Sequence, residues 1–176
     1  SLELLVGVTG LVSLGHAAFF GIAAYACALL GQADVQSLWL TMAGSVATAA
    51  AYALVAGALA LRTRGVYFIM VTLAFGQMAY FVFHDTSVGG GSDGIYLNAK
   101  PVLGSWLDLD QPLPMYAFIL ACLGLVFVFL AVLRRSRFGR ALAGIKASEQ
   151  RMRASGFSTY PYKLAAFTLS GGIAAL

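Results

Sequence analysis

The chain has 176 residues, of which 60% are hydrophobic and only 10% are charged, with a mean hydropathy of +0.85. Because soluble domains carry about a quarter charged residues, this composition excludes a water-exposed globule and indicates an integral membrane protein. The net charge of +4 would ordinarily suggest nucleic acid as a partner, and two cysteines without a CxxC pattern provide no metal or redox framework.

Apolar segments follow one another along the chain, and a span needs roughly 20 residues as a helix. Five are expected: residues 4–33, 38–61, 65–83, 115–133 and 163–176. The first contains glycines and a polar cluster at 13–16, so one long tilted helix and a broken helix followed by a span both fit. The sequence opens without Met and stops in an apolar run, so we expect a fragment whose last span is truncated. The series of apolar segments predicts an all-α polytopic bundle of transmembrane helices, with residues 1–176 as one transmembrane domain.

The basic residues set the expected orientation, because Lys and Arg mark the cytoplasmic side of a membrane protein. If residues 134–163 are cytoplasmic, ten of the eleven basic residues fall inside and only Lys100 falls outside. This bias predicts a multi-pass protein whose 134–162 loop faces the cytoplasm. It also explains the positive charge by topology and removes nucleic acid as a partner.

Residues 134–161 form the only long polar and basic segment. At helical spacing, its apolar residues share one face: Phe138, Leu142, Ile145 and Met152. Glu149 falls on the same stripe and can pair with Arg153, and Gly156 stands where a helix would end. Such a helix either lies on anionic lipid headgroups or inserts its apolar face into a soluble partner.

No enzyme constellation is found, and the sequence contains no GxxxxGKS/T phosphate loop. The GGGSDG run at 89–94 is either a tight glycine turn or an outer loop contacted by a substrate-delivery partner through Gly90, Ser92 and Asp93. Polar side chains within the apolar segments either hydrogen-bond between helices or line a translocation path. These candidates are Ser13, His16, Thr72 and Gln77.

Four sequence blocks carry a resemblance to a known family. They are SLGHAAFFGIAAY (13–25), LRTRGVYFIMVTLAFGQM (61–78), GGGSDGIYL (89–97) and RSRFGRALAGIKASEQ (135–150), with YKLAAF (162–167) after them. Together they resemble permease subunits of branched-chain amino-acid ABC importers. The resemblance implies a bacterial plasma membrane location, a second permease subunit, ATP-binding subunits on the cytoplasmic side and an external substrate-binding protein, besides membrane lipid. No cofactor or metal is implied in this chain, because the partner binds ATP.

The resemblance also implies that the basic segment is the ATPase-coupling loop, in which the helix around 141–154 moves as a lever. Its expected residues are Phe138, Gly139, Arg140, Leu142, Ile145, Glu149, Met152 and Gly156. The family's Glu-Ala-Ala-x-x-x-Gly motif is degenerate, because Gln150, Arg151 and Met152 occupy its first three positions and only the glycine matches. The expected substrates are leucine, isoleucine or valine, although related permeases serve urea, amides or other amino acids.

A secondary transporter or channel subunit without an ATPase partner is the alternative. Such a protein needs an ion-coupling site, typically acids or lysines within its spans. The apolar segments 38–61, 65–83 and 115–133 contain no charged residue. A purely structural lipid-surface anchor is a third possibility.

Overall fold

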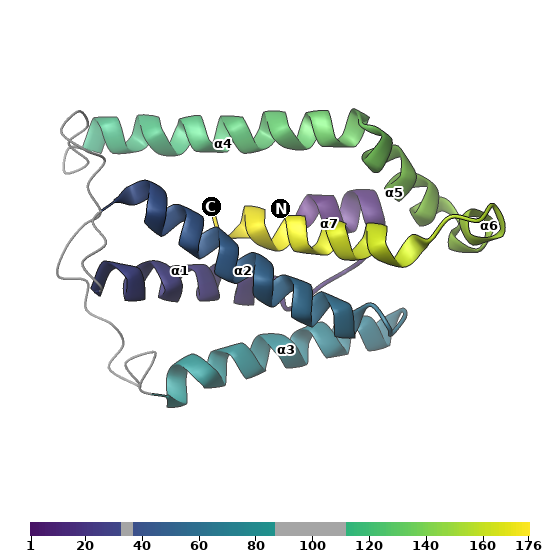
Figure 1. Cartoon of the computed structure of the whole chain (residues 1–176), viewed down its shortest axis with the longest axis horizontal. Coiled ribbons are helices and arrows are strands. Elements are labelled where there is room, and N and C mark those ends of the chain that lie inside the picture. The colour runs from purple at the N-terminus through teal and green to yellow at the C-terminus, as the bar shows by residue number, and fades with distance from the viewer. Residues whose placement is uncertain (33–36, 87–111) are drawn as a thin grey trace.

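The computed structural model describes residues 1–32, 37–86 and 112–176, and its regular elements in these ranges are all helical. This confirms the all-α class. In chain order (Figure 1) the elements are η1 (Leu4–Thr9), α1 (His16–Gln32), α2 (Leu38–Ala60), α3 (Val66–Asp85), α4 (Pro112–Arg135), α5 (Arg137–Ala147), α6 (Glu149–Ala154) and α7 (Thr159–Ala174).

Three of the described helices are long and apolar enough to cross a membrane: Leu38–Ala60, Val66–Asp85 and Leu113–Arg135. The apolar stretch His16–Gly31 is shorter, and α7 has 16 residues. The second, third and fourth predicted segments therefore correspond to full spans. The first predicted segment is interrupted by a chain reversal, so it corresponds to η1 and the shorter helix α1. The fifth corresponds to α7, Thr159–Ala174.

The first apolar segment is broken, as one of the two alternatives predicted. The π-helical turn η1 ends at Gly10, whose φ of 72° is a left-handed conformation that glycine adopts without strain. Residues 10–15 then bring the chain back (Figure 1), so that the Ser1 hydroxyl lies 2.9 Å from His16 Nε2. The polar cluster at 13–16 is therefore part of a chain reversal and the start of α1, rather than the middle of one helix.

Helix α2 packs extensively against both α1 and α7, and small residues make this possible. A Cβ on Gly171 of α7 would lie 2.5 Å from the Ala53 Cβ of α2. Close approach through small residues is the usual way for helices to associate in lipid. Aromatic rings fill the adjoining core, where Phe167 meets Phe19 and Phe68 edge to face at centroid distances of 5.5 and 6.2 Å.

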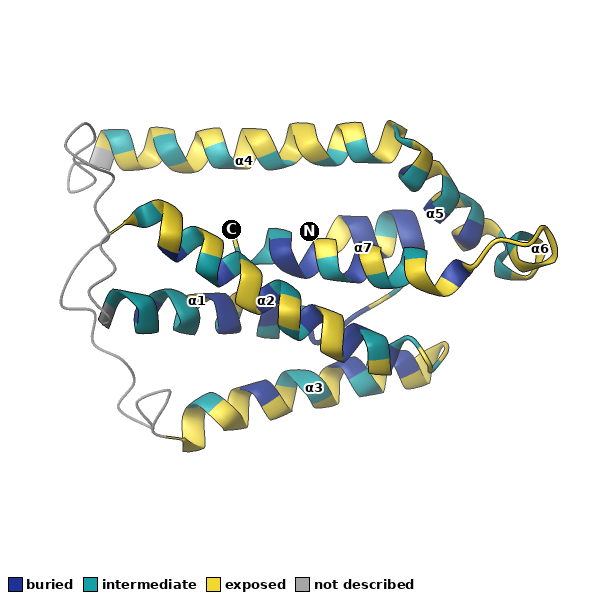
Figure 2. Cartoon of the chain, in the orientation of Figure 1, coloured by how far each residue is buried: buried dark blue, intermediate teal, exposed yellow. Residues whose placement is uncertain are grey.

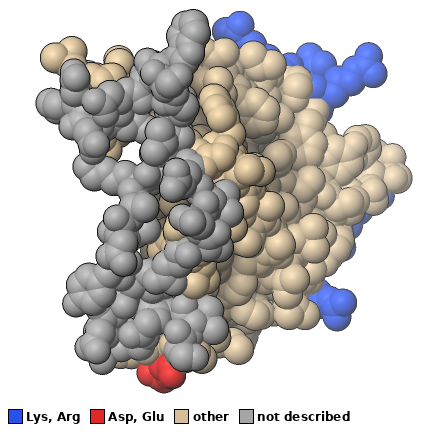
Figure 3. Space-filling view, turned by 60° about the vertical axis from the view of Figure 1, so that its left-hand side comes forward, with Lys and Arg blue, Asp and Glu red and all other residues tan. Residues whose placement is uncertain are grey.

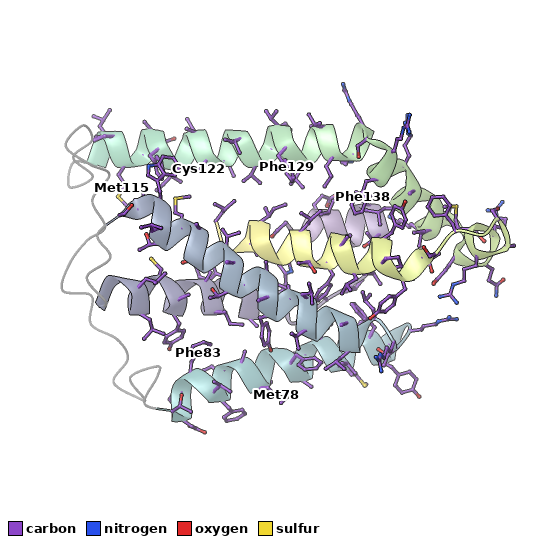
Figure 4. The ribbon with its side chains drawn as sticks, viewed as in Figure 1. Met78, Phe83, Met115, Cys122, Phe129 and Phe138 are labelled. Atoms are coloured by element: carbon purple, nitrogen blue, oxygen red, sulfur yellow. The ribbon has the colours of Figure 1, made fainter. Side chains whose placement is uncertain are left out.

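Helix α4 runs along the flank of the bundle and contacts mainly α5. Its surface is exposed along almost its whole length (Figure 2). Met115, Cys122 and Phe129 are distributed along it, and Phe138 follows at the start of α5 (Figure 4). The exposed residues of α4 are mostly apolar, which is the composition expected of a surface that meets lipid or other membrane helices.

The two ends of the bundle differ in charge. The ends of α2 and α4, the starts of α3 and α7, and helices α5 and α6 gather at one end, together with ten basic residues. In Figure 3 the opposite end of the bundle is turned toward the viewer. The visible Lys and Arg side chains project at the upper and right-hand margins of the picture. All the basic residues in the described ranges thus belong to one end, as the predicted topology requires.

Candidate translocation path and coupling segment

Helices α1 and α3 touch backbone to backbone where α1 begins. A Cβ on Gly15 would lie 2.1 Å from the Thr72 carbonyl oxygen, and a Cβ on Gly76 would lie 3.3 Å from Gly15 Cα. Only residues without a side chain permit this approach. We call this contact of Gly15 with Thr72 and Gly76 the α1–α3 crossing.

A cavity of about 490 Å³ lies on the side of the crossing toward the C-terminal end of α3. Among the described residues its walls come from α1, from α3 and from Leu14 and Gly15 just before α1, and we call it the outer cavity. The Tyr25 and Phe83 rings stack across the two helices at 4.4 Å between centroids. Phe83 points between the helices in Figure 4, whereas Met78 is largely exposed.

A second cavity, of about 660 Å³, lies at the basic end of the bundle. The chain reversal contributes Gly10 to Val12, and the turn between α2 and α3 contributes Arg62 and Arg64. The charged residues Glu149, Arg153 and Lys163 complete the lining from α6 and α7. We call it the inner cavity. On α3 it is lined up to Ile69, whereas the outer cavity begins at Leu73, so the α1–α3 crossing lies between the two.

The predicted path residues occupy different places around the crossing. Ser13 and Thr72 are both buried and line a void of about 10 Å³, enough for one water molecule. The Thr72 hydroxyl donates to the Ile69 carbonyl at 2.9 Å, whereas Ser13 Oγ has no hydrogen-bond partner among the described residues. Gln77 lines the outer cavity. The structure thus brings Ser13 and Thr72 together and places Gln77 beside them on the outer side.

His16 is placed differently from the other three. Its Nε2 bonds the Ser1 hydroxyl, and its ring meets the Phe19 ring edge to face. Its Nδ1 is buried and has no partner within the described part of the chain. It is not among the residues that line the outer or the inner cavity. The roles of all four residues stay predictions.

The apolar face of the basic segment is buried within this chain. Leu142 is fully buried and Ile145 is 3% exposed, in a cluster with Leu4, Val8 and Ala166. Phe138 and Met152 pack at the margin of the same cluster. This face is therefore not open in the described structure. The physical reason is that η1 and α7 supply apolar surfaces that cover it. Its insertion into a soluble partner stays a prediction.

The prediction of a single helix around 141–154 is wrong, because the helix is interrupted at Ser148. This residue is extended, with φ −162° and ψ 101°, and its hydroxyl accepts a hydrogen bond from the Arg151 N–H. Ser136 caps α5 in the same way, accepting from the Gly139 N–H. Two serines at helix starts are an N-cap signal that sequence inspection could have used.

Two other residues of the segment shape its turns. A Cβ on Gly139 would lie 2.4 Å from the Leu133 carbonyl oxygen, so glycine is needed for the tight corner between α4 and α5. Gly156 ends α6 with φ 79°. The hydrogen bonds Gly156 N–H to Arg153 O and Phe157 N–H to Met152 O complete a Schellman motif. The predicted C-cap at Gly156 is confirmed.

Glu149 joins α6 to α7 through a polar network. The predicted pair with Arg153 is present at 2.6 Å, and a second ion pair with Lys163 at 2.7 Å was missed. The Thr159 hydroxyl lies 3.1 Å from both the Glu149 carboxylate and Arg153 Nε. Burial alone would raise the pKa of Glu149, but the hydrogen bond and charge of Lys163, with help from Thr159 and Arg153, hold it below its ordinary value of 4.5.

The loop residues Gly90, Ser92 and Asp93 lie outside the described residues, so their predicted contact with a binding protein stays a prediction. Arg140 is exposed on α5. Sequence reasoning missed the α1–α3 crossing, and it also missed Tyr25, Gly21 and Phe83 as lining residues. For the crossing, the only signal in the sequence was that Gly15 lies in a polar cluster and Gly76 in an apolar segment. That signal does not say that these two glycines meet.

The whole chain, residues 1–176, matches the family described as the permease component of the branched-chain amino acid transport system. It is 33% identical to the high-affinity branched-chain amino acid transport system permease protein LivM of Escherichia coli K12. The corresponding Salmonella typhimurium protein is 32% identical. Each alignment covers 98% of this chain and 46% of the relative, so the chain spans about half the length of these curated relatives.

No solved structure matches the chain significantly. The family match extends over all the elements that build the two cavities, the crossing and the basic segment 134–161. Family membership and the apolar helices together make this a multi-pass membrane protein. The chain belongs to the family of permease components of branched-chain amino acid transport systems.

Proposed function

We propose that this chain is a membrane-spanning subunit of an ABC importer that moves branched-chain amino acids into the cytoplasm. ATP is hydrolysed on a separate subunit that docks at the basic end of the bundle. A second permease subunit completes the pore, and an external binding protein delivers the substrate. The family and the relatives' names support the substrate class, and the clustering of basic residues supports a cytoplasmic position for that end.

The observation that carries this proposal is the attachment of α5 and α6 to the bundle. Leu142 and Ile145 are buried against η1 and α7. The Lys146 ammonium donates to the Gly7 carbonyl at 2.7 Å, and Glu149 pairs with Lys163 at 2.7 Å. A segment so anchored cannot shift by itself, because packed interfaces move as units. A displacement imposed on α5 and α6 therefore moves η1 and α7 as well.

We call α5 and α6 together the coupling segment. The contact with the ATPase subunit then belongs to the face of this segment opposite the buried one. The exposed residues of α5 and α6 on that face are small or basic, apart from one glutamine: Arg140, Ala143, Ala147, Gln150, Arg151 and Ala154. Small side chains allow close approach of a second surface, and arginine is enriched in protein interfaces. We assign ATPase docking to this face instead of the buried apolar stripe.

The two cavities give the segment something to control. In this structure the α1–α3 crossing separates the outer cavity from the inner one. The inner cavity is lined both by the chain reversal after η1 and by Glu149, Arg153 and Lys163. A movement of α6 and α7 therefore changes the walls of the inner cavity directly. This is the arrangement that alternating access requires, provided the ATPase binds the two states with different affinity.

The test is uptake by the complete transporter in proteoliposomes, with its binding protein and radiolabelled leucine. ATP should drive accumulation, and an imposed ion gradient without ATP should not. Uptake that follows the ion gradient and ignores ATP would contradict the proposal and support a secondary transporter. Copurification of an ATP-binding subunit with the tagged chain is the accompanying control, since a lipid-surface anchor would bring none.

A further inference from the structure

Gly21 faces open space inside the outer cavity. It lines the cavity from α1, and a Cβ built on it meets no atom of the described residues within 4 Å. The other glycines of this region are in contact with neighbouring backbone or side chains: Gly15 with Thr72, Gly44 with Leu30 and Gly76 with Gly15. Packing among the described helices therefore does not explain the missing side chain at position 21, although glycine costs helix stability relative to alanine.

The walls around this space are apolar and aromatic, with polar groups on one helix. Ile22 and Tyr25 line the cavity from α1, and Leu73 and Phe83 from α3. The stacked pair of Tyr25 and Phe83 closes one side. Gln77 and His84 supply hydrogen-bonding groups from α3, and the His84 ring stacks on Tyr80 at 5.3 Å between centroids. Apolar walls with a few polar groups are the usual composition of a small-molecule site.

We propose that the outer cavity is the site where the permease itself receives its substrate, and that Gly21 leaves the room for a branched apolar side chain. The volume of about 490 Å³ falls within the range of small-molecule pockets. The ligand class is an amino acid whose aliphatic side chain lies against Ile22 and Leu73, with its charged end toward Gln77. Selection in the membrane then adds to any selection by a binding protein. This proposal rests on the proposed function and assigns its substrate site.

The experiment replaces the missing side chain in steps, as Gly21→Ala, Gly21→Val and Gly21→Leu, in the complete transporter. Because a Cβ on Gly21 meets no atom of the described residues within 4 Å, the alanine methyl is accommodated without displacing the bundle, and the larger side chains extend from it into the cavity. The matched control is Gly124→Leu on α4, where a Cβ also meets nothing within 4 Å and which does not line the cavity. The measurements are ATP-driven uptake of leucine and of valine at saturating binding protein, and ATP hydrolysis stimulated by the loaded binding protein.

The expected result is a graded loss of leucine uptake along the series, reaching about tenfold for Gly21→Leu, since single methylene groups are discriminated by such factors. The leucine-to-valine uptake ratio should fall along the Gly21 series, whereas Gly124→Leu should keep the wild-type uptake ratio and the wild-type rate of stimulated ATP hydrolysis. A ratio that stays equal to that of Gly124→Leu through the series overturns the proposal. If Gly21→Leu transports neither substrate, the ratios for Gly21→Ala and Gly21→Val decide.

These outcomes are separate from failure of the proposed function. That failure appears in the wild-type transporter, as absence of ATP-driven leucine uptake. The present proposal concerns only how uptake changes with the side chain at position 21. A wild-type transporter that imports leucine, together with a Gly21 series that does not alter selectivity, would leave the function intact and remove the site from the outer cavity.

Discussion

The carbonyl oxygen of Thr72 occupies the place where a side chain on Gly15 would begin, because a Cβ there would lie only 2.1 Å away. This single contact closes the space between α1 and α3. It lies between the outer cavity and the inner cavity, and the buried Ser13 hydroxyl faces a small void beside it. The α1–α3 crossing is thus a backbone contact that stands between the two cavities of the candidate path.

Gly15→Ala, just before α1, should therefore destabilise the protein, whereas Gly21→Ala within α1 should not. The alanine methyl at position 15 meets backbone, which cannot rotate away, and overpacking of this kind costs about 1–3 kcal/mol. Thermal unfolding of the purified transporter in detergent measures the difference. Equal unfolding temperatures for the two variants would show that α1 and α3 are not in contact at Gly15.

Leu142→Asp should impair folding, whereas Ala143→Asp should impair transport only, although the two residues are neighbours. Leu142 is fully buried, so a carboxylate there is an unpaired buried charge and should prevent folding. Ala143 is exposed on the face assigned to ATPase docking, so its variant should fold at wild-type levels and lose uptake. Membrane protein yield and transport rate separate the two effects. A well-folded, uncoupled Leu142→Asp would restore the apolar face as the docking surface.

Glu149→Gln should destabilise the coupling segment at neutral pH but not at low pH. The pKa of Glu149 is lower in the folded protein than its ordinary 4.5, so the contribution of the charged carboxylate is present above pH 4.5. It is lost as the pH falls through the folded-state pKa. The unfolding temperatures of wild type and variant should converge as the pH is lowered below 4.5. A difference that is the same at every pH would contradict this origin.

Tyr52→Phe should weaken the attachment of α2 to α3. The Tyr52 hydroxyl donates to the Phe75 carbonyl at 2.6 Å, and such interhelical bonds contribute about 0.6 kcal/mol on average. Tyr67→Phe is the matched control, because that side chain is 74% exposed. Unfolding in denaturant should distinguish the two, with the smaller effect for Tyr67→Phe. The reverse order would show that the Tyr52 hydroxyl does not hold α2 against α3.

The sequence predicted the helices well because spans are local features. The uninterrupted apolar runs 38–61 and 65–83 became α2 and α3 within two residues at either end. Capping is also local, and Gly156 ends α6 as expected. The ion pair of Glu149 with Arg153 was predictable for the same reason, since residues four apart on a helix are neighbours.

What the sequence could not show depends on distant partners. The cluster that buries Leu142 includes Leu4 and Val8, which are far away along the chain. Helical periodicity identifies an apolar face but does not say whether the same chain or another one covers it. The contact of Gly15 with Thr72 was hidden in the same way. Both residues belong to sequence blocks that resemble the permease family, but one sequence gives no pairing between blocks.

The most direct test of the account is thiol accessibility on the two sides of the α1–α3 crossing. Gln77→Cys reports on the outer cavity and Ile69→Cys on the inner cavity, each in a Cys27→Ser, Cys122→Ser background. Labelling with a membrane-impermeant thiol reagent is measured in the complete transporter, with and without ATP trapped on the ATPase subunits. The account predicts that ATP raises labelling at one position and lowers it at the other. Labelling that is unchanged by ATP, or that rises or falls together at both positions, would contradict it.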